Sequence, residues 1–403
     1  MPESVVSVPG SAAVLDPAPA PLCRTYAEVT ELRSRDPRAI GRALAARRRR
    51  PAFLPPDGRL MLVAADHPAR GALAAQGRPT AMYSRTDMLD RLRTALARPG
   101  VDGLLATADI AEDLLLLGAL EDKVVVASMN RGGLAGSAFE LDDRMTAYDV
   151  RGVVDARFDA AKMLNRIDLD DPGTVAMLET AGRAISELAR AGVVAMLEPF
   201  LSGRVEGRVV NDLSPDAVIR SVHIAQGLGA TSAFTWLKLP VVAEMARVMD
   251  ATTLPTLLLG GDPSTRPEET YGTWREALAL PSVRGLVVGR TLLYPPDDDD
   301  LVRTGLQGVR AAGRQLEPAE AGVSPAGRLG GDLQRIGPGG RAPGGQVQRA
   351  GGRGHALLLG WRGAAPVQGP AASSRAVGGT GVLSQWTRDT AVSTAAPTSS
   401  SGG

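Results

Sequence analysis

The chain has 403 residues, of which 44% are hydrophobic, and its formal net charge is +1. This composition can form a core, and the near-neutral charge gives no reason to expect nucleic acid or a membrane surface as a partner. One cysteine and three scattered histidines argue against a disulfide framework and against a metal site. The sequence contains neither a leader-like segment nor an apolar run of about 18 residues. We therefore expect a cytoplasmic protein without a cofactor.

The two ends of the chain differ in composition from its middle. Residues 1–24 are rich in Pro, Ala and Ser without periodicity, which predicts disorder, and residues 25–52 favour a helical extension that contains an arginine run. Residues 315–403 are dominated by Gly, Ala, Pro, Arg and Ser, a composition that cannot offset the ordering entropy of a fold. We expect a disordered low-complexity tail there. A shifted reading frame in GC-rich DNA would produce such a tail, a hypothesis that sequencing of the locus tests.

Between these ends, short apolar runs alternate with longer segments of helical periodicity. The expected strands are 59–66, 101–108, 123–129, 160–167, 192–199, 234–240, 255–261 and 284–290. The expected helices are 86–98, 110–120, 151–158, 174–191, 214–229, 241–250 and 273–280. Val- and Leu-rich runs without alternation favour parallel strands that are covered on both faces. Eight such units within residues 53–300 predict an α/β fold, a (β/α)8 TIM barrel.

A doubly wound sheet is the alternative architecture. That fold usually has a Gly-rich nucleotide-binding turn after its first strand, whereas the first strand here ends in AADHP. The closing helix is the weakest element of the predicted barrel, because residues 301–314 have helical spacing but contain three glycines. This segment is either a poor closing helix or the start of unrelated sequence.

Four polar residues stand at or near the ends of expected strands, where the active site of a (β/α)8 barrel lies. Asp66 ends the first strand and Glu198 the fifth, while Lys162 and Lys238 lie within the fourth and the sixth. Side chains alternate between the two faces of a strand. If the faces that carry these residues point inward, two lysines and two carboxylates share one cavity.

This set of side chains suits Schiff-base chemistry. Only three of the 45 basic residues are lysines, and arginine could not replace them, because a guanidinium stays protonated. A lysine attacks a carbonyl as the free amine, which the apolar run around Lys238 and the positive charge of Lys162 both favour. The iminium then acts as an electron sink, while Glu198 or Asp66 transfers protons. The structural alternatives are a surface lysine at Lys238, a salt-bridge role for Glu198 and a loop cap at Asp66.

Residues 59–294 resemble the class I, Schiff-base-forming bacterial aldolases of the tagatose-bisphosphate and fructose-bisphosphate type. The resemblance is carried by the order of AADHPARG, AAKMLNRID, MLEPF, WLKLPVV, LLLGGDPS and GLVVGRTLLYP. It implies a metal-free barrel enzyme with Lys238 as the nucleophile, assisted by Lys162, Glu198 and Asp66.

The expected substrate contacts lie at the glycine-rich strand ends, late in the fourth strand and in the loop after the third strand. The residues expected to bind the substrate or its phosphate group are Gly260, Gly261, Gly289, Arg290, Asn165 and Arg131. The fourth strand continues with NRI where the sugar-bisphosphate enzymes tend to be aromatic, and Asp262 would oppose a phosphate unless Arg266 or Arg290 compensates. These departures indicate a divergent subgroup, similar to actinobacterial deoxyribose-phosphate-aldolase-like proteins or to aldolase-like barrels of inositol catabolism.

The sequence thus predicts a class I aldolase, a carbon–carbon lyase, for a phosphorylated sugar or keto-sugar acid. Two other functions stay open: a catalytically silent barrel that binds a sugar phosphate as a sensor or scaffold, and an acyl- or carbon-transferring relative that uses the same lysine. His67, beside Pro68, is interpreted as a loop-structural residue. Homo-oligomerisation is compatible with such a barrel, although no interface is evident from the sequence.

Overall fold

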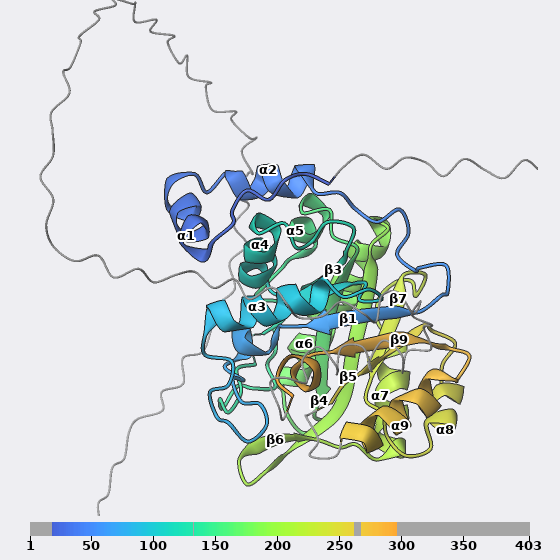
Figure 1. Cartoon of the computed structure of the whole chain (residues 1–403). Helices are drawn as coiled ribbons and strands as arrows, with labels where there is room; N and C mark the ends of the chain where they lie inside the picture. The colour runs from blue at the N-terminus through green and yellow to red at the C-terminus, as the bar shows by residue number, and fades with distance from the viewer. Residues whose placement is uncertain (1–17, 132, 262–266, 296–403) are drawn as a thin grey trace, which may run out of the picture. The chain divides into compact units, whose positions relative to one another are not determined.

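A computed structural model of the chain describes residues 18–131, 133–261 and 267–295. Within these residues, eight parallel strands form a closed ring with helices between successive strands (Figure 1). The ring contains β1 (Leu60–Ala64), β2 (Gly103–Ala106), β3 (Val124–Ser128), β4 (Ala160–Ile167), β5 (Val194–Val205), β7 (Thr235–Leu239), β8 (Thr256–Leu259) and β9 (Val283–Val288). Pairing of β1 with β9 closes it. The predicted (β/α)8 TIM barrel is confirmed, and closure of the sheet excludes the doubly wound alternative.

The helices around the ring follow the expected order along the chain. They are α3 (Arg85–Leu96), α4 (Ala108–Leu116), α5 (Val150–Asp155), α6 (Gly173–Arg190), α7 (Pro215–Gln226), α8 (Met245–Asp250), α9 (Pro267–Leu278) and α10 (Arg290–Leu293), with the 3-10 helix η1 (His67–Arg70) after β1. Ser214 caps α7 by accepting a hydrogen bond from the amide of Ala217, and Pro215 occupies the first turn. Helix α8 begins later than expected, because Glu244 has a left-handed backbone conformation with φ of 54°.

The apolar residues form two cores, one on each side of the strands. In β1, Leu60 and Leu62 belong to the inner core of the barrel, whereas Met61 and Val63 pack outward against the helices. All four side chains are fully buried, and each such burial contributes roughly 1.5–3 kcal/mol. Burial on both faces is the physical reason for the uninterrupted apolar runs of the sequence.

The N-terminal extension is anchored to the barrel by α1 (Tyr26–Arg35), α2 (Ala39–Ala46) and the residues around them (Figure 1). Cys23, in the stretch expected to be disordered, is buried, and its amide donates to the carbonyl of Leu116 at 2.9 Å. The Arg47 side chain is fully buried and donates to two backbone carbonyls at 3.1 and 2.9 Å. Phe53 packs edge-on against Trp236 of the inner core, with ring centroids 5.2 Å apart. The extension therefore covers the end of the barrel opposite the C-terminal strand ends.

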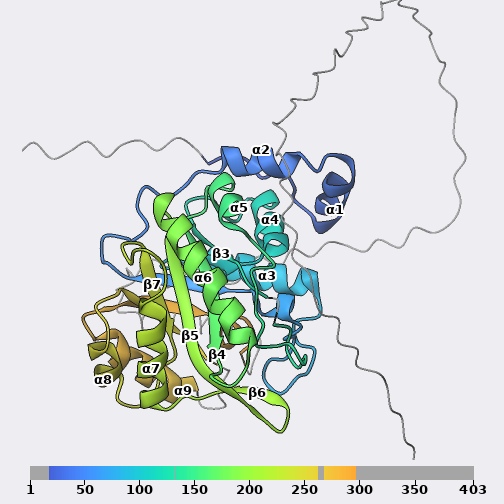
Figure 2. The ribbon, with the colours of Figure 1, turned by 180° about the vertical axis from the view of Figure 1, so that it is seen from behind.

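A hairpin that the sequence analysis did not anticipate extends from the ring. Strand β5 continues past Pro199, where the expected strand ended, and pairs in antiparallel orientation with β6 (Arg208–Asn211) (Figure 2). Glu206 and Gly207 form its turn with φ of 50° and 77°, the positive values that two-residue hairpin turns require. Arg204 donates to the carbonyl of Ala138 at 2.7 Å, which ties the hairpin to the loop that follows β3.

Several expectations concern residues beyond the described part. The expected helix 301–314, the tail 315–403, residues 1–17, Asp262 and Arg266 lie outside the described residues. Among the described helices, none combines the length and the apolar character needed to cross a bilayer. The described residues also contain no cluster of three or more His, Cys, Asp or Glu arranged to hold a metal ion.

Candidate active site

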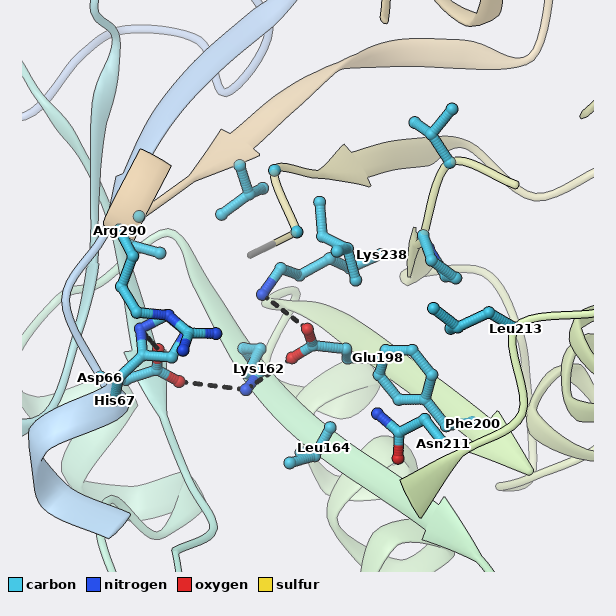
Figure 3. Close-up of a pocket in the computed structure, with 18 of the residues that line it drawn as sticks. Asp66, His67, Lys162, Leu164, Glu198, Phe200, Asn211, Leu213, Lys238 and Arg290 are labelled. Carbon is cyan, nitrogen blue, oxygen red and sulfur yellow. Dashed lines mark hydrogen bonds and ion pairs between the residues drawn. The ribbon is translucent and has the colours of Figure 1, made fainter. Parts of the chain in front are cut away.

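A cavity of about 660 Å³ lies at the C-terminal ends of the barrel strands. Asp66, Lys162, Glu198 and Lys238 all line it, and their charged ends point toward one another (Figure 3). The structure therefore brings together the four residues for which the sequence analysis predicts catalytic roles. All four are buried, with exposed fractions of 8% or less.

Strand alternation explains why these side chains meet. Met196 and Trp236 belong to the inner core of the barrel. Glu198 lies two residues after Met196 and Lys238 two residues after Trp236, so both side chains point to the same inner side, one step nearer the C-terminal end. Lys162 is the Cα partner of Met196 on the neighbouring strand β4. Three strands thus direct two amines and one carboxylate into the same cavity.

The Glu198 carboxylate lies between the two lysines. Its Oε2 atom is 2.7 Å from Nζ of Lys162, and its Oε1 atom is 2.9 Å from Nζ of Lys238. Lys162 has a second partner, Oδ2 of Asp66 at 3.0 Å, and the same oxygen accepts a hydrogen bond from the Ser128 hydroxyl at 3.1 Å. Lys162 therefore contacts two carboxylates, whereas Lys238 contacts one.

Burial and charge act in opposite directions on this cluster. Burial alone would raise the pKa of Glu198, but the charges of Lys162 and then Lys238 outweigh it and lower that pKa to about 2. Burial opposes ionisation of Asp66 too, and the charge of Lys162 holds its pKa far below the ordinary range. Burial lowers the pKa of Lys162, but attraction by Asp66 and Glu198 prevails and raises it. At neutral pH both carboxylates are ionised and Lys162 is an ammonium ion.

The glycine-rich strand ends form another side of the cavity. Gly260, Gly261, Gly289 and Arg290 all line it, as the phosphate-binding prediction requires. A Cβ atom at Gly260 would lie 2.7 Å from Cγ1 of Val288, and one at Gly289 would lie 2.8 Å from the carbonyl oxygen of Ala64. Glycine therefore suits both positions, because the neighbouring chain segment leaves too little room for a side chain.

His67 also lines the cavity, beside Arg290 and Asp66 (Figure 3). Its Nδ1 atom is 3.8 Å from Oδ1 of Asp66. Burial lowers the pKa of His67 to about 4, and the charge of Arg290 adds to this effect, so the imidazole is neutral at physiological pH. The residue interpreted as loop-structural thus lies on the cavity wall.

The structure places two of the expected substrate contacts elsewhere. Asn165 is fully buried, and its Nδ2 group donates to Sδ of Met177 at 2.9 Å, on the helix-facing side of β4. Because side chains alternate, Arg166 lines the cavity instead, together with Leu164. Arg131 is half-buried in the loop after β3 and does not contribute to the cavity wall. Both expectations are corrected, and alternation counted from Lys162 would have identified Arg166.

A second charged cluster lies at the rim of the cavity. Arg166 forms an ion pair with Glu140, and its Nη2 group donates to the carbonyls of Glu140 and Gly133 at 2.7 and 3.2 Å. Arg70, in η1, is 3.8 Å from the same carboxylate. Glu140 comes from an irregular loop, so no periodic pattern of the sequence could have indicated it.

A protein-family model matches the part of the chain that forms the barrel. The model of the Cgl0159-like family matches residues 58–306. The crystal structure of Cgl0159 from Corynebacterium glutamicum (Brevibacterium flavum) is 53% identical, with 71% of this chain and 96% of that chain covered and a TM-score of 0.69. None of the curated proteins compared with the chain matches it.

Two aldolases show a more distant structural likeness. An archaeal fructose 1,6-bisphosphate aldolase is 17% identical, with 68% of this chain and 98% of that chain covered and a TM-score of 0.48. A fructose-bisphosphate aldolase from Slackia heliotrinireducens is 14% identical, with 67% and 84% covered and a TM-score of 0.47. Similarity at this level does not indicate an activity for this chain. The match over most of the barrel and the 53% identity show instead that the chain belongs to the Cgl0159-like family.

Proposed function

We propose that the protein is a Schiff-base-forming, metal-independent aldolase that acts on a phosphorylated sugar or keto-sugar acid. The observation that carries this proposal is the Glu198 carboxylate placed between two buried amines, at 2.7 and 2.9 Å. A buried cluster of this kind can hold one amine as a cation and exchange a proton with the other. Imine formation and carbon–carbon bond cleavage both need this combination.

The contacts distinguish the roles of the two lysines. Lys162 is paired with both Asp66 and Glu198, which raise its pKa and keep it an ammonium ion that cannot attack a carbonyl. Lys238 has Glu198 as its carboxylate partner, and an ionised Glu198 can accept the proton that Lys238 must lose. Lys238 is therefore assigned as the nucleophile. Lys162 supplies the fixed positive charge, and Asp66 positions Lys162.

The reaction follows from these assignments. The Lys238 amine, having given one proton to Glu198, adds to the ketone carbon. The carbonyl oxygen leaves as water with one amine proton and the proton returned by Glu198, so a protonated imine forms and Glu198 is again a carboxylate. Glu198 removes the proton of the hydroxyl group β to the imine, the bond between the α and β carbons breaks, and its electron pair forms an enamine as an aldehyde departs. Proton return from Glu198 to the α carbon regenerates the protonated imine, and addition of water then releases the ketone and the free amine, with the remaining proton passing to Glu198. No oxidant or reductant is consumed, and the imine nitrogen is the electron sink.

The proposed orientation of the substrate uses the glycine-lined side of the cavity. A phosphate group fits beside Gly260, Gly261 and Gly289, where the backbone comes to the cavity surface and Arg290 adds a positive charge. Phosphate sites of (β/α)8 barrels are frequently formed by the loops after the last two strands. The phosphorylated, ketone-bearing part of the substrate would then lie next to Lys238.

Borohydride trapping tests the proposal. The protein is incubated with dihydroxyacetone phosphate, fructose bisphosphate, deoxyribose phosphate or pyruvate, reduced, and mapped by peptide mass spectrometry. We expect an adduct on the Lys238 peptide, absent in Lys238→Arg and retained in the matched control Lys162→Arg, which keeps the positive charge. An adduct on Lys162 would reverse the assigned roles.

The absence of an adduct with every carbonyl, in a protein that still binds sugar phosphates, would favour a catalytically silent barrel. The pattern of labelling carbonyls also tests the subgroup, deoxyribose-phosphate-aldolase-like or similar to the barrels of inositol catabolism. A cytoplasmic location and a homo-oligomeric state stay predictions from the sequence.

A further inference from the structure

The β5–β6 hairpin forms the wall of the cavity that lies across from the phosphate-binding side. Phe200 from β5, Val209 and Asn211 from β6, and Leu213 after β6 all line the cavity. Figure 3 shows Phe200, Asn211 and Leu213 on one side of Glu198, with His67 and Arg290 on the other. The catalytic cluster is therefore between a cationic, glycine-rich side and a largely apolar side.

Arg166, a cation that lines the cavity on the strand next to this wall, is already paired with other groups. Arg166 is the Cα partner of Phe200 on the neighbouring strand. Its guanidinium group is paired with the Glu140 carboxylate and donates to the carbonyls of Glu140 and Gly133. A second anionic group of a substrate would have to displace Glu140 or be buried against apolar side chains, and both are costly. The hairpin side therefore favours an uncharged group.

Among the four side chains of this wall, Asn211 is the polar one. Its Oδ1 atom accepts a hydrogen bond from the Ser202 hydroxyl at 2.9 Å, which fixes the orientation of the carboxamide. Among the described residues, its Nδ2 group donates no hydrogen bond. Asn211 is half-buried and lines the cavity, and Figure 3 shows its amide nitrogen on the side nearer to Glu198. A preoriented N–H donor thus faces the place where the second half of a substrate would lie.

We propose that the β5–β6 hairpin recognises the part of the substrate that leaves as an aldehyde, and that the Asn211 carboxamide donates a hydrogen bond to a hydroxyl group of that uncharged, hydroxylated fragment. This inference rests on the proposed function. It adds the chemical class of the aldehyde and a binding residue for it. With phosphate at the glycine-rich side and the ketone carbon at Lys238, the departing aldehyde lies against the hairpin.

The test compares aldehydes in the direction of synthesis. The donor is the carbonyl compound that gives the highest yield of Lys238 adduct in the trapping panel, and the acceptors are glycolaldehyde, acetaldehyde and glyoxylate. We expect the wild-type protein to prefer glycolaldehyde over both others in kcat/KM. Asn211→Leu is expected to reduce the preference for glycolaldehyde over acetaldehyde by roughly three- to tenfold, as for loss of one neutral hydrogen bond, with unchanged labelling of Lys238 by the donor alone.

Ser202→Ala is the matched control. It removes the hydrogen bond that orients the carboxamide but keeps the Asn211 N–H donor, so we expect a smaller loss of preference than in Asn211→Leu. Donor labelling verifies that each variant is folded, and Asn211→Ala replaces Asn211→Leu if the latter does not label.

Three results would overturn the inference: an unchanged preference in the Asn211 variants, an equal loss in Ser202→Ala, or a wild-type preference for glyoxylate. If no carbonyl labels Lys238 in the wild-type protein, the proposed function itself fails and the inference fails with it.

Discussion

Replacement of Glu198 by glutamine changes the central contact of the cavity while keeping the shape of the side chain. Glu198 is 8% exposed and contacts both lysines. In Glu198→Gln, Lys162 keeps Asp66 as a partner, but the amide no longer offsets the charge of Lys238. We therefore expect a marked loss of stability, because a buried charge is left without compensation.

The lowered pKa of Glu198 sets the size of this loss. Despite burial, which acts in the opposite direction, Lys162 and Lys238 lower the pKa from 4.5 to about 2. One pKa unit corresponds to about 1.4 kcal/mol, so the ionised carboxylate stabilises the folded state by about 3 kcal/mol. Removal of one partner from a buried ion pair costs a similar amount, about 3–5 kcal/mol.

The pH dependence has a definite sign. Because the pKa of Glu198 is lower in the folded state, its stabilisation is complete above about pH 4.5 and is lost as the pH falls through about 2. By about pH 3, about 2 kcal/mol of it is gone. Urea denaturation followed by intrinsic fluorescence should therefore show a difference of about 3 kcal/mol between wild type and Glu198→Gln at neutral pH, and about 1 kcal/mol at about pH 3.

The matched control is Glu179→Gln. Glu179 is an exposed carboxylate paired with Arg183 at 3.6 Å along one helix, and its loss should change the free energy of unfolding by less than about 0.5 kcal/mol. The reasoning is refuted if Glu198→Gln is as stable as the wild type at neutral pH. It is also refuted if the difference between the two is the same at about pH 3.

Gly285→Ala should prevent folding or destabilise the barrel by more than about 3 kcal/mol, because Gly285 has φ of +132° and an added Cβ atom would lie 1.8 Å from the carbonyl oxygen of Leu60 in the closing strand pair. The control is Gly272→Ala in α9, where an added Cβ meets nothing within 4 Å; it should leave the free energy of unfolding unchanged or raise it by up to about 1 kcal/mol. The midpoints of urea denaturation of the two variants test both expectations. The imidazole resonances of His67, identified by their loss in His67→Asn, should not titrate between about pH 7.5 and 5.5, because burial and then the charge of Arg290 lower its pKa to about 4. A midpoint near the ordinary value of 6.5 would contradict the described surroundings of the ring.

The positions of the barrel strands and of the four charged residues could be predicted from the sequence because both depend on short-range patterns. Strands buried on both faces must be uninterrupted apolar runs, as in Leu60–Ala64. In a barrel, polar residues late in such runs lie at the C-terminal ends of the strands. Lys238 and Glu198 follow Trp236 and Met196 by two residues, so alternation puts each on the same face as its predecessor, and the structure shows that these faces point inward.

Only the tertiary structure decided which groups contact one another, because those contacts depend on register between strands distant in sequence. It placed Glu198 between the two lysines and gave Lys162 the second carboxylate, which distinguishes the amines. It also formed the hairpin that carries Asn211 to the cavity wall. Periodicity specifies which residues share a face of a single strand. It does not specify how far that strand extends past its neighbours, or which loop residues lie over its end.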